Sequence, residues 1–348
     1  MRKIKLFKPY VSWYAVWNAV KTLRSGQLAE GPRVKEFERE FGKKFNMEHI
    51  CSLNSGTTAL ELAYELAGIK EGDEVITPVL TCTATNIPLV RLKAKIIFAD
   101  IENDLNISIE DVKKKITPRT KAIVFVHFGG NNRGLKELVE LAKKRNILLI
   151  EDAAQAIGSD YWGKADFTCV SLQAIKILTS GDGGILICKN PELDKKARRL
   201  RWFGYDRDLK QKQGDSDLIE AGYKYHMNDV TAAIALGNLK VIDKLVDHRK
   251  KLIEEYKKHG IDAHIWFATV FNKRRDGLKK YLSDNGIESG VYHYRNDKYT
   301  IFGGKQSFKN MDRLENDYLV LPLHQYVTVS DVQYICGVIN KFNTSQSS

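Results

Sequence analysis

Three polar segments, each placed directly after an apolar run, contain the residue types needed to hold and activate an amine. The first is SLQAIK (171–176), which ends in Lys176 and precedes the glycine-rich TSGDGG (179–184). Desolvation lowers the pKa of a lysine and leaves more of it as the nucleophilic amine. The alternative is an exposed loop lysine, which is the usual place for this side chain.

The second segment ends the apolar run ILLIED (147–152), whose last residue is Asp152. A carboxylate at the end of a buried strand is costly to ionise unless a cation faces it. A protonated pyridine nitrogen is such a cation. The simpler alternative is that Asp152 caps the next helix.

The third segment, NSGTT (54–58), lies between the strand-like HICSL (49–53) and a helical pattern. A strand, a short turn and a helix start expose backbone N–H groups that bind phosphate, and the helix dipole adds about 0.3–1 kcal/mol. An ordinary Ser/Thr helix cap explains the same residues. Together, a phosphate cradle, a carboxylate for a pyridinium and an amine for an imine are what pyridoxal phosphate requires of a protein.

The elements that must position these segments alternate between strands and helices over the first two thirds of the chain. Runs such as IVFV (123–126) are apolar throughout, which is typical of strands covered on both faces. Strands separated by helices predict crossover units, and therefore an α/β fold with a mostly parallel sheet flanked by helices. The expected strands are 49–53, 73–78, 95–100, 121–126, 147–152, 167–171 and 184–188, and the expected helices include 57–67, 84–92 and 135–144.

The pattern changes near residue 231, where a Lys-rich amphipathic segment runs to Gly260, a typical helix end. Beyond it we expect a strand-like run at 264–271, a helix at 275–285, a strand-like run at 289–294 and a last helix from Ser330. We therefore predict three parts, with the N-terminal segment free to pack on the last of them. They are a large cofactor-binding α/β domain over 1–235, a connecting helix over 236–260 and a small α+β domain over 261–348.

The composition is that of a folded protein with excess positive charge. Of 348 residues, 43% are hydrophobic and 28% are charged, and the formal net charge is +12, which permits nucleic acid or anionic small molecules as partners. Zinc-finger spacing and a basic zipper are absent, so we expect neither nucleic acid nor a metal. A nicotinamide oxidoreductase would fit the sheet, but G-x-G-x-x-G is absent. No run of 18 apolar residues predicts a membrane span. Five cysteines without C-x-x-C spacing favour reduced thiols and a cytoplasmic protein.

Several motifs, in order along almost the whole chain, resemble the DegT/DnrJ/EryC1/StrS family of sugar aminotransferases. That family has the aspartate-aminotransferase-like fold type I, with a large domain and a small C-terminal domain. The matching segments are GPRVKEFEREF (31–41), NSGTTAL (54–60), TPVLTCTATN (77–86), EDAAQAIGS (151–159), SLQAIK (171–176), TSGDGG (179–184), RLRWFGYDR (199–207), GYKYHMNDVTAAI (222–234) and LPLH (321–324).

The resemblance implies a role for each matching residue. Lys176 forms the internal aldimine with pyridoxal 5′-phosphate and moves a proton, with pyridoxamine phosphate as the intermediate form of the cofactor. Asp152 keeps the pyridine nitrogen protonated, and Gln155 hydrogen-bonds the phenolic oxygen of the ring. The residues that hold the phosphate are Gly56, Thr57 and Ser171.

Two further roles concern the ring face and the subunit interface. Cys82 stands where many family members place an aromatic residue over the ring, and a thiol packs there as a small polarizable group; a buried core cysteine is the alternative. Asn228 aligns with an asparagine that reaches the phosphate of the neighbouring subunit's cofactor. The resemblance therefore implies a homodimer with active sites at the subunit interface.

The activity that the resemblance implies is transfer of an amino group from L-glutamate to a nucleotide-linked keto sugar. The segments TCTATN, QAIK, WFGYDR and KYHMN are similar to those of 4-aminotransferases. We therefore expect a nucleoside-diphosphate 4-keto-6-deoxyhexose as substrate and a 4-amino-4,6-dideoxyhexose for glycan synthesis, such as O-antigen of lipopolysaccharide, as product. The alternatives are a 3-keto sugar and a catalytically inactive binding module on the same fold.

Some residues depart from the family pattern or have two explanations. His226 and Lys224 replace a common Arg and Asn, which puts the sugar contacts in doubt, and Asp182 replaces a common Glu. Gly31 and Pro32 fit either a lid near the partner's site or a helix start. The candidate sugar or phosphate contacts, some of which fit core packing equally, are Tyr292, His293, Tyr294 and Arg295. The candidate diphosphate-attracting cations, which fit a solvated helix face as well, are Lys195, Lys196, Arg198, Arg199, Arg201, Arg207, Lys210 and Lys212.

Overall fold

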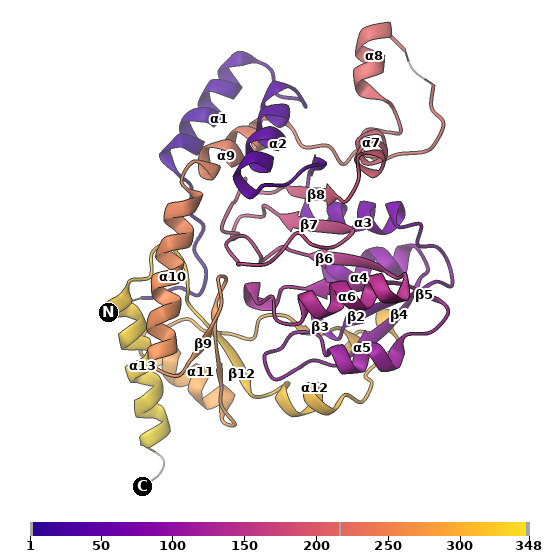
Figure 1. Ribbon diagram of the computed structural model, residues 1–348. Helices are drawn as coiled ribbons and strands as arrows, with labels where there is room; N and C mark the ends of the chain where they lie inside the picture. The colour runs from indigo at the N-terminus through magenta and orange to yellow at the C-terminus, as the bar shows by residue number, and fades with distance from the viewer. Residues whose placement is uncertain (1–2, 216, 346–348) are drawn as a thin grey trace.

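The computed structural model describes residues 3–215 and 217–345 around a seven-stranded sheet in the order β1-β8-β7-β6-β5-β2-β4 (Figure 1). Strand β8 is antiparallel to both of its neighbours, while β7, β6, β5, β2 and β4 pair in parallel. The predicted mostly parallel sheet is therefore confirmed. Its strands are β1 (Ile50–Leu53), β2 (Glu74–Pro78), β4 (Lys95–Ala99), β5 (Thr120–Val126), β6 (Leu148–Asp152), β7 (Phe167–Ser171) and β8 (Gly184–Cys188).

Both faces of this sheet are covered, which is why a central strand such as β5 has an almost continuous apolar run. In β5, Ala122 and Val124 belong to one core, and Ile123 and Phe125 to the core on the opposite face. Side chains alternate between the faces of a strand, so a continuous apolar run supplies two cores at once. One face is covered by α3 (Gly56–Leu66), α4 (Thr83–Arg91) and α7 (Pro191–Leu200), and the other by α5 (Ile109–Lys115) and α6 (Leu135–Arg145).

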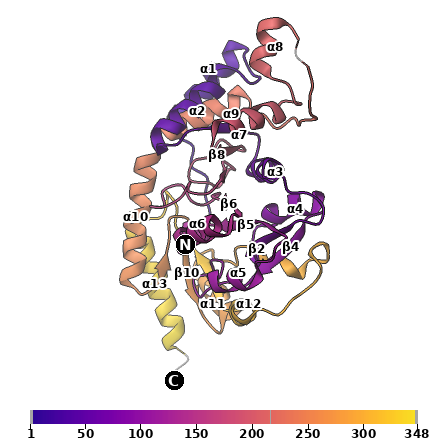
Figure 2. The ribbon, with the colours of Figure 1, turned by 45° about the vertical axis from the view of Figure 1, so that its right-hand side comes forward.

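Three helices form a layer beyond the β1 edge of the sheet (Figures 1 and 2). They are α1 (Trp13–Ser25), α2 (Pro32–Phe45) and α9 (Asp229–Leu239). Helix α1 crosses α9 at Gly237, where an added Cβ would lie 2.2 Å from the Ala15 nitrogen. Only glycine permits that approach. The short α8 (Arg207–Gln213) projects away from the sheet in both views.

The connecting segment differs from the predicted single helix over 236–260. Helix α9 ends at Leu239 and a second helix, α10 (Ile242–Lys258), begins after Val241, which leaves helical geometry. The two helices have different surroundings: α9 is buried on most of its surface, whereas α10 is amphipathic. A break at residues 240–241 lets each helix follow the layer on which it packs.

The C-terminal part contains a three-stranded antiparallel sheet in the order β12-β10-β9. Residue Ile4 of the N-terminal segment pairs with Ile287 and joins the core of this part. Its strands are β9 (Asp262–Ala263), β10 (Ala268–Phe271) and β12 (Tyr318–Leu321), and its helices are α11 (Arg275–Asp284), α12 (Lys309–Leu314) and α13 (Val329–Thr344), the last alongside α10. Among the described residues, no helix is long and apolar enough to cross a membrane.

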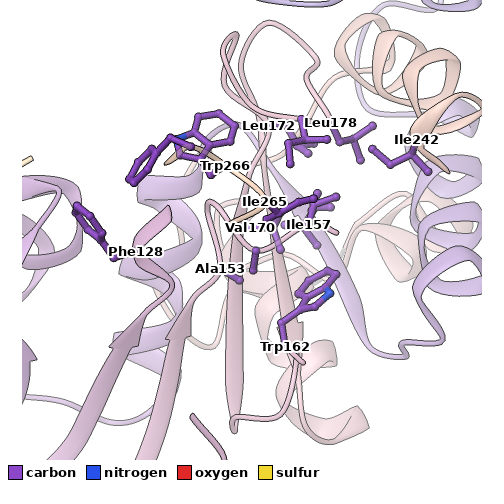
Figure 3. Close-up of a cluster of buried hydrophobic side chains, with 14 of the residues drawn as sticks. Phe128, Ala153, Ile157, Trp162, Val170, Leu172, Leu178, Ile242, Ile265 and Trp266 are labelled. Atoms are coloured by element: carbon purple, nitrogen blue, oxygen red, sulfur yellow. The ribbon is translucent and has the colours of Figure 1, made fainter. Parts of the chain in front are cut away.

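Two predicted strands of this part are shorter than expected because their residues serve the contact with the large sheet. In the run 264–271, Ile265 and Trp266 pack among Val170, Leu172 and Leu178 instead of continuing β10 (Figure 3). In the run 289–294, only the end forms a strand. It is β11 (Tyr294–Arg295), which pairs with β3 (Leu80–Thr81), immediately before Cys82.

A buried ion-pair network joins α2 and α7 to β1, the strand that leads to the NSGTT segment. Arg201 lies 2.7 Å from Glu38 and 2.8 Å from Glu30, and Arg198 lies 2.8 Å from the second oxygen of Glu38. The backbone N–H and the hydroxyl of Ser52 also donate to Glu38, at 2.9 and 2.7 Å. Burial raises the pKa of Glu38, but Arg201, Arg198 and the Ser52 N–H outweigh it and lower the pKa to about 2.

Replacing Glu38→Gln should reduce the free energy of unfolding by about 3 kcal/mol at pH 7, because the buried Arg201 and the half-buried Arg198 each lose one of their two carboxylate partners. A carboxylate with a lowered folded-state pKa stabilises the fold above its unfolded value of 4.5, and this stabilisation is lost as the pH falls towards 2. Urea denaturation of both proteins at a series of pH values should therefore show the difference between their free energies of unfolding shrinking as the pH falls from 4.5 towards 2. Glu40→Gln, on the more exposed side of the same helix, is the control; an equal loss there would contradict the role of the network.

Candidate functional site

A cavity of about 420 Å³ lies beyond the carboxyl ends of β1, β5, β6 and β7, the edge where open α/β sheets bind ligands. The small C-terminal part closes it with Tyr292 and His293. Seven of the eight residues predicted for the site line this cavity, although they are up to 120 positions apart in sequence. They are Gly56, Thr57, Cys82, Asp152, Gln155, Ser171 and Lys176.

Lys176 lies in the loop between β7 and β8, where its backbone N–H donates to the carbonyl of Gln173 at 2.8 Å. Its Nζ is 4.8 Å from the centre of the Trp266 ring. Burial lowers the pKa of Lys176, and the negative charge of Asp152 opposes this shift without cancelling it. The amine is therefore neutral and nucleophilic at a lower pH than that of an exposed lysine.

Asp152 ends β6 with both carboxylate oxygens hydrogen-bonded. The hydroxyl of Thr85 donates to Oδ2 at 2.8 Å, and the N–H of Ala154 donates to Oδ1 at 3.2 Å. Burial raises the pKa of Asp152, while these donors and the charge of Lys176 act in the opposite direction. A buried carboxylate of this kind can hold a cation or a proton on a ring nitrogen. Thr85 was not among the predicted site residues; its signal is the polar TATN run that follows a strand end.

The N-terminus of α3 forms the opposite end of the cavity. Ser55 caps the helix by accepting from the N–H of Thr58 at 3.1 Å. The N–H groups of Gly56 and Thr57, in the first turn, have no acceptor within the helix. A Cβ on Gly56 would lie 2.8 Å from the Cβ of Ser171. Glycine is therefore required for β7 to bring the Ser171 hydroxyl to this helix terminus, where an anion is favoured.

Gln155 and His293 meet at the side of the cavity. The Oε1 of Gln155 accepts from the N–H of Gly129 at 2.8 Å, and its Nε2 lies 3.2 Å from Nε2 of His293. Burial, together with the charge of Lys176, lowers the pKa of His293 to about 3. The imidazole is therefore neutral at physiological pH. The sequence indicated His293 only as one of several candidate sugar contacts, because nothing in the pattern places it beside Gln155.

Cys82 and Asn228 have different positions relative to the cavity. Cys82 is the residue before α4 and lines the cavity half-buried; burial raises the pKa of its thiol, which keeps it protonated. Asn228 is exposed and does not line the cavity of its own chain. Its side chain caps α9 by accepting from the N–H of Thr231 at 2.9 Å. A role for Asn228 in a neighbouring subunit stays a prediction.

Most of the predicted diphosphate-attracting cations are paired with carboxylates. Arg201 is buried between Glu30 and Glu38, Arg207 lies 3.0 Å from Glu30, and Arg199 lies 2.8 Å from Glu220. The three arginines and Glu30 line a second cavity of about 540 Å³ beside α7 and α8. The paired arginines therefore hold the local structure together, and the role of the stretch in attracting a diphosphate stays a prediction.

The departures from the family pattern lie beside the predicted phosphate cradle. His226 pairs with Leu53 of β1 and lies edge-on to Trp202, with 3.9 Å between ring centroids. Burial and the nearby Arg207 lower the pKa of His226 to about 4. Asp182 lines the cavity and accepts from the N–H of Gly183 at 2.8 Å. Within the described ranges, no group of three His, Cys, Asp or Glu side chains could hold a metal ion.

Comparison with known proteins gives consistent results over nearly the whole chain. The model of the DegT/DnrJ/EryC1/StrS aminotransferase family matches residues 15–340. The UDP-4-amino-4,6-dideoxy-N-acetyl-beta-L-altrosamine transaminase of Campylobacter jejuni serotype O:23/36 is 32% identical over 346 residues, covering 90% of this chain and 91% of the relative.

Solved structures share the fold. The crystal structure of the aminotransferase TlmJ from Streptoalloteichus hindustanus superposes with a TM-score of 0.91 at 28% identity and covers 99% of this chain and 100% of that one. Spr1654 from Streptococcus pneumoniae, solved in its PMP form, superposes with a TM-score of 0.90 at 25% identity and covers 100% of both chains.

We expect the Lys176 amine to titrate below the ordinary lysine value of 10.5, because its ammonium form is desolvated. Trace acetylation with acetic anhydride at a series of pH values, quantified by mass spectrometry of the Lys176 peptide, measures this midpoint because only the neutral amine reacts. Asp152→Asn should lower it further, since the charge that favours the ammonium form is removed. Asp182→Asn, in the same cavity, should leave it in place. A wild-type midpoint of 10.5 or above, or an upward shift in Asp152→Asn, would contradict the electrostatic account.

Proposed function

The chain belongs to the DegT/DnrJ/EryC1/StrS aminotransferase family, and from that membership we propose that it transfers an amino group from L-glutamate to the C4 ketone of a nucleotide-linked 4-keto-6-deoxyhexose. The product is the corresponding 4-amino-4,6-dideoxyhexose. The observation that carries the proposal is the placement of Lys176, Asp152 and the N-terminus of α3 around one cavity.

The predicted family, fold and class of reaction are confirmed. The chain is an aminotransferase with the aspartate-aminotransferase-like fold type I. The two other classes considered, a nucleic-acid-binding protein and a nicotinamide oxidoreductase, are therefore excluded. Its relatives act on nucleotide-linked sugars, as the name of the Campylobacter enzyme states.

The side chains of the cavity fit pyridoxal phosphate as the cofactor. An amine of lowered pKa, Lys176, suits an aldehyde; a buried carboxylate, Asp152, suits a ring nitrogen; and Gly56, Thr57 and Ser171 offer N–H and hydroxyl donors for a phosphate. Gly56 lies so close to Ser171 that a Cβ on Gly56 would clash with the serine, so both groups can face the same phosphate only because residue 56 is glycine. We propose that these residues hold pyridoxal phosphate, with Gln155 at its phenolic oxygen and Cys82 at its ring face.

The reaction requires an electron sink and a mobile proton. Pyridoxal phosphate, when bound, supplies the sink as a conjugated, positively charged ring. Asp152 keeps that charge by holding the proton on the pyridine nitrogen, and Thr85 and Ala154 hold Asp152 in place. Lys176 is the acid and base that moves a proton at the reacting carbon, first of glutamate and then of the sugar. Its lowered pKa makes the amine a better acceptor of that proton below the pH at which an exposed lysine titrates.

Two features support the C4 position and a dimeric active unit. The Campylobacter relative is named for a 4-amino-4,6-dideoxy sugar, and this chain matches it over 90% of its length. Asn228, exposed at the start of α9, is free to complete the phosphate site of a second subunit. We propose that the active unit is a homodimer in which Asn228 acts on the partner's cofactor.

The cofactor proposal is tested by incubating the purified protein with pyridoxal phosphate. We expect a visible absorbance band that survives gel filtration, and borohydride reduction should attach the cofactor to the Lys176 peptide. Lys176→Ala should lose the band and lower turnover by about 10²–10⁴-fold. A colourless wild-type protein, or a Lys176→Ala variant as yellow and active as the wild type, would refute it.

The substrate is tested with a panel of nucleotide-linked 3-keto and 4-keto sugars and L-glutamate, followed by mass spectrometry. We expect conversion of ketone to amine with the 4-keto-6-deoxyhexoses, together with an equal amount of 2-oxoglutarate. NMR of the product identifies the aminated carbon. Turnover of 3-keto sugars alone would replace the C4 assignment with the C3 alternative.

The trans role of Asn228 predicts complementation between two defective chains. Lys176→Ala and Asn228→Ala should each be impaired alone. After random exchange of subunits at equal amounts, half of the dimers are mixed and each has one intact site, so about a quarter of wild-type activity should return. If Asn228 acted within its own chain, mixing would restore nothing.

A further inference from the structure

The amide of Gln155 is held at both ends. Its Oε1 accepts from the backbone N–H of Gly129 at 2.8 Å, so the amide cannot rotate by 180° without leaving that donor unpaired. Its Nε2 lies 3.2 Å from Nε2 of His293. An amide nitrogen has two N–H groups. One is directed to His293, and the second is available to the cavity that both residues line.

His293 is itself held rigidly in an uncommon conformation. Its φ of 62° lies in the left-handed region, which few non-glycine residues adopt. The hydroxyl of the buried Tyr318 donates to the His293 carbonyl at 2.7 Å. The next two residues, Tyr294 and Arg295, form β11 on β3 of the large part. A strained backbone conformation that is held in place by several surrounding contacts is typical of functional sites.

The segment after His293 is anchored by buried polar groups. The side chain of Asn296 donates to the carbonyl of Thr81 at 2.7 Å and accepts from Asn86 at 2.8 Å, and all three residues are buried. Arg295 is buried between Asp297 and further carboxylates. The position of the His293 ring is therefore determined by the way the small part docks on the large one.

The protonation state of the ring completes the contact. A neutral imidazole has one donor and one acceptor nitrogen, and Nε2 must be the acceptor because it faces the amide nitrogen of Gln155. The proton is then on Nδ1. Burial and the charge of Lys176 keep the pKa of His293 near 3, so this arrangement persists over the working pH range.

We propose that His293 is a positioning residue, which aims the free N–H of Gln155 at the phenolic oxygen of the bound ring and thereby makes the docked small domain part of the cofactor site. The inference rests on the proposed function. A hydrogen-bond donor at the phenolic oxygen lowers the proton affinity of that oxygen. It also lowers the proton affinity of the Lys176 nitrogen, which shares a proton with the phenolic oxygen when the cofactor is bound. His293 should therefore influence the colour change of the bound cofactor with pH, without contacting the reacting atoms.

The test compares His293→Asn with His293→Gln in protein loaded with pyridoxal phosphate. Asparagine tolerates the left-handed backbone, but its side chain is too short to reach Gln155, whereas glutamine can place an amide oxygen where Nε2 lies. We expect His293→Asn to raise the pH midpoint of the colour change by about one unit and to weaken pyridoxal phosphate binding by about 3–10-fold. His293→Gln should restore most of both values.

Two further variants distinguish positioning from general damage. In a Gln155→Ala background, His293→Asn should cause no additional shift, because the two residues act through one hydrogen bond. Tyr318→Phe removes the hydroxyl that holds the His293 carbonyl and should raise the pH midpoint of the colour change by a smaller amount. It replaces His293→Asn as the test if thermal unfolding without cofactor shows that His293→Asn does not fold. A folded His293→Asn protein with the wild-type midpoint, or an equal shift in the Gln155→Ala background, would overturn the proposal. A wild-type protein that takes up no cofactor overturns the proposed function, and this inference with it.

Discussion

The burial of an amine and a carboxylate in one cavity is the constraint on which the rest of the structure depends. Desolvation lowers the pKa of Lys176 and raises that of Asp152, while their mutual attraction acts in the opposite direction for each. The cavity must therefore be tight enough to desolvate both groups, yet must keep the carboxylate hydrogen-bonded through Thr85 and Ala154. The nucleophilic character of the amine follows from that balance, and a more open site would give an ordinary lysine and an ordinary aspartate.

The surrounding fold positions this cavity by bringing the ends of several strands together through buried contacts. Gly56 lets the end of β7 approach the start of α3, and the buried network of Glu38 with Arg201 and Arg198 fixes β1, which leads into that start. On the other side, the pairing of β11 with β3 docks the small part next to Cys82. Each contact joins segments far apart in sequence, so the geometry of the site depends on the packing of the whole chain.

Much of the site could be predicted because its residues follow apolar strands, and a parallel sheet brings the carboxyl ends of its strands to one edge. This reasoning places Asp152, Ser171 and Lys176 together without knowledge of the fold. It does not find Thr85 or Trp266, whose contributions depend on where a helix and a loop from other parts of the chain pack. In the basic stretch around Arg201, composition gives the excess charge but not the partners: Glu38 of α2 and Glu30, just before that helix, both pair with Arg201.

The sequence by itself determined the order of strands and helices, the family of the chain and the chemical type of the cavity residues, because these depend on local pattern and on which side chains are present. Only the tertiary structure decided the pKa directions, the paired state of the arginines, the break between α9 and α10, and the contact of His293 with Gln155. Those properties depend on desolvation and on contacts between separate elements of the fold. Such contacts are set by packing, which no local stretch of sequence contains.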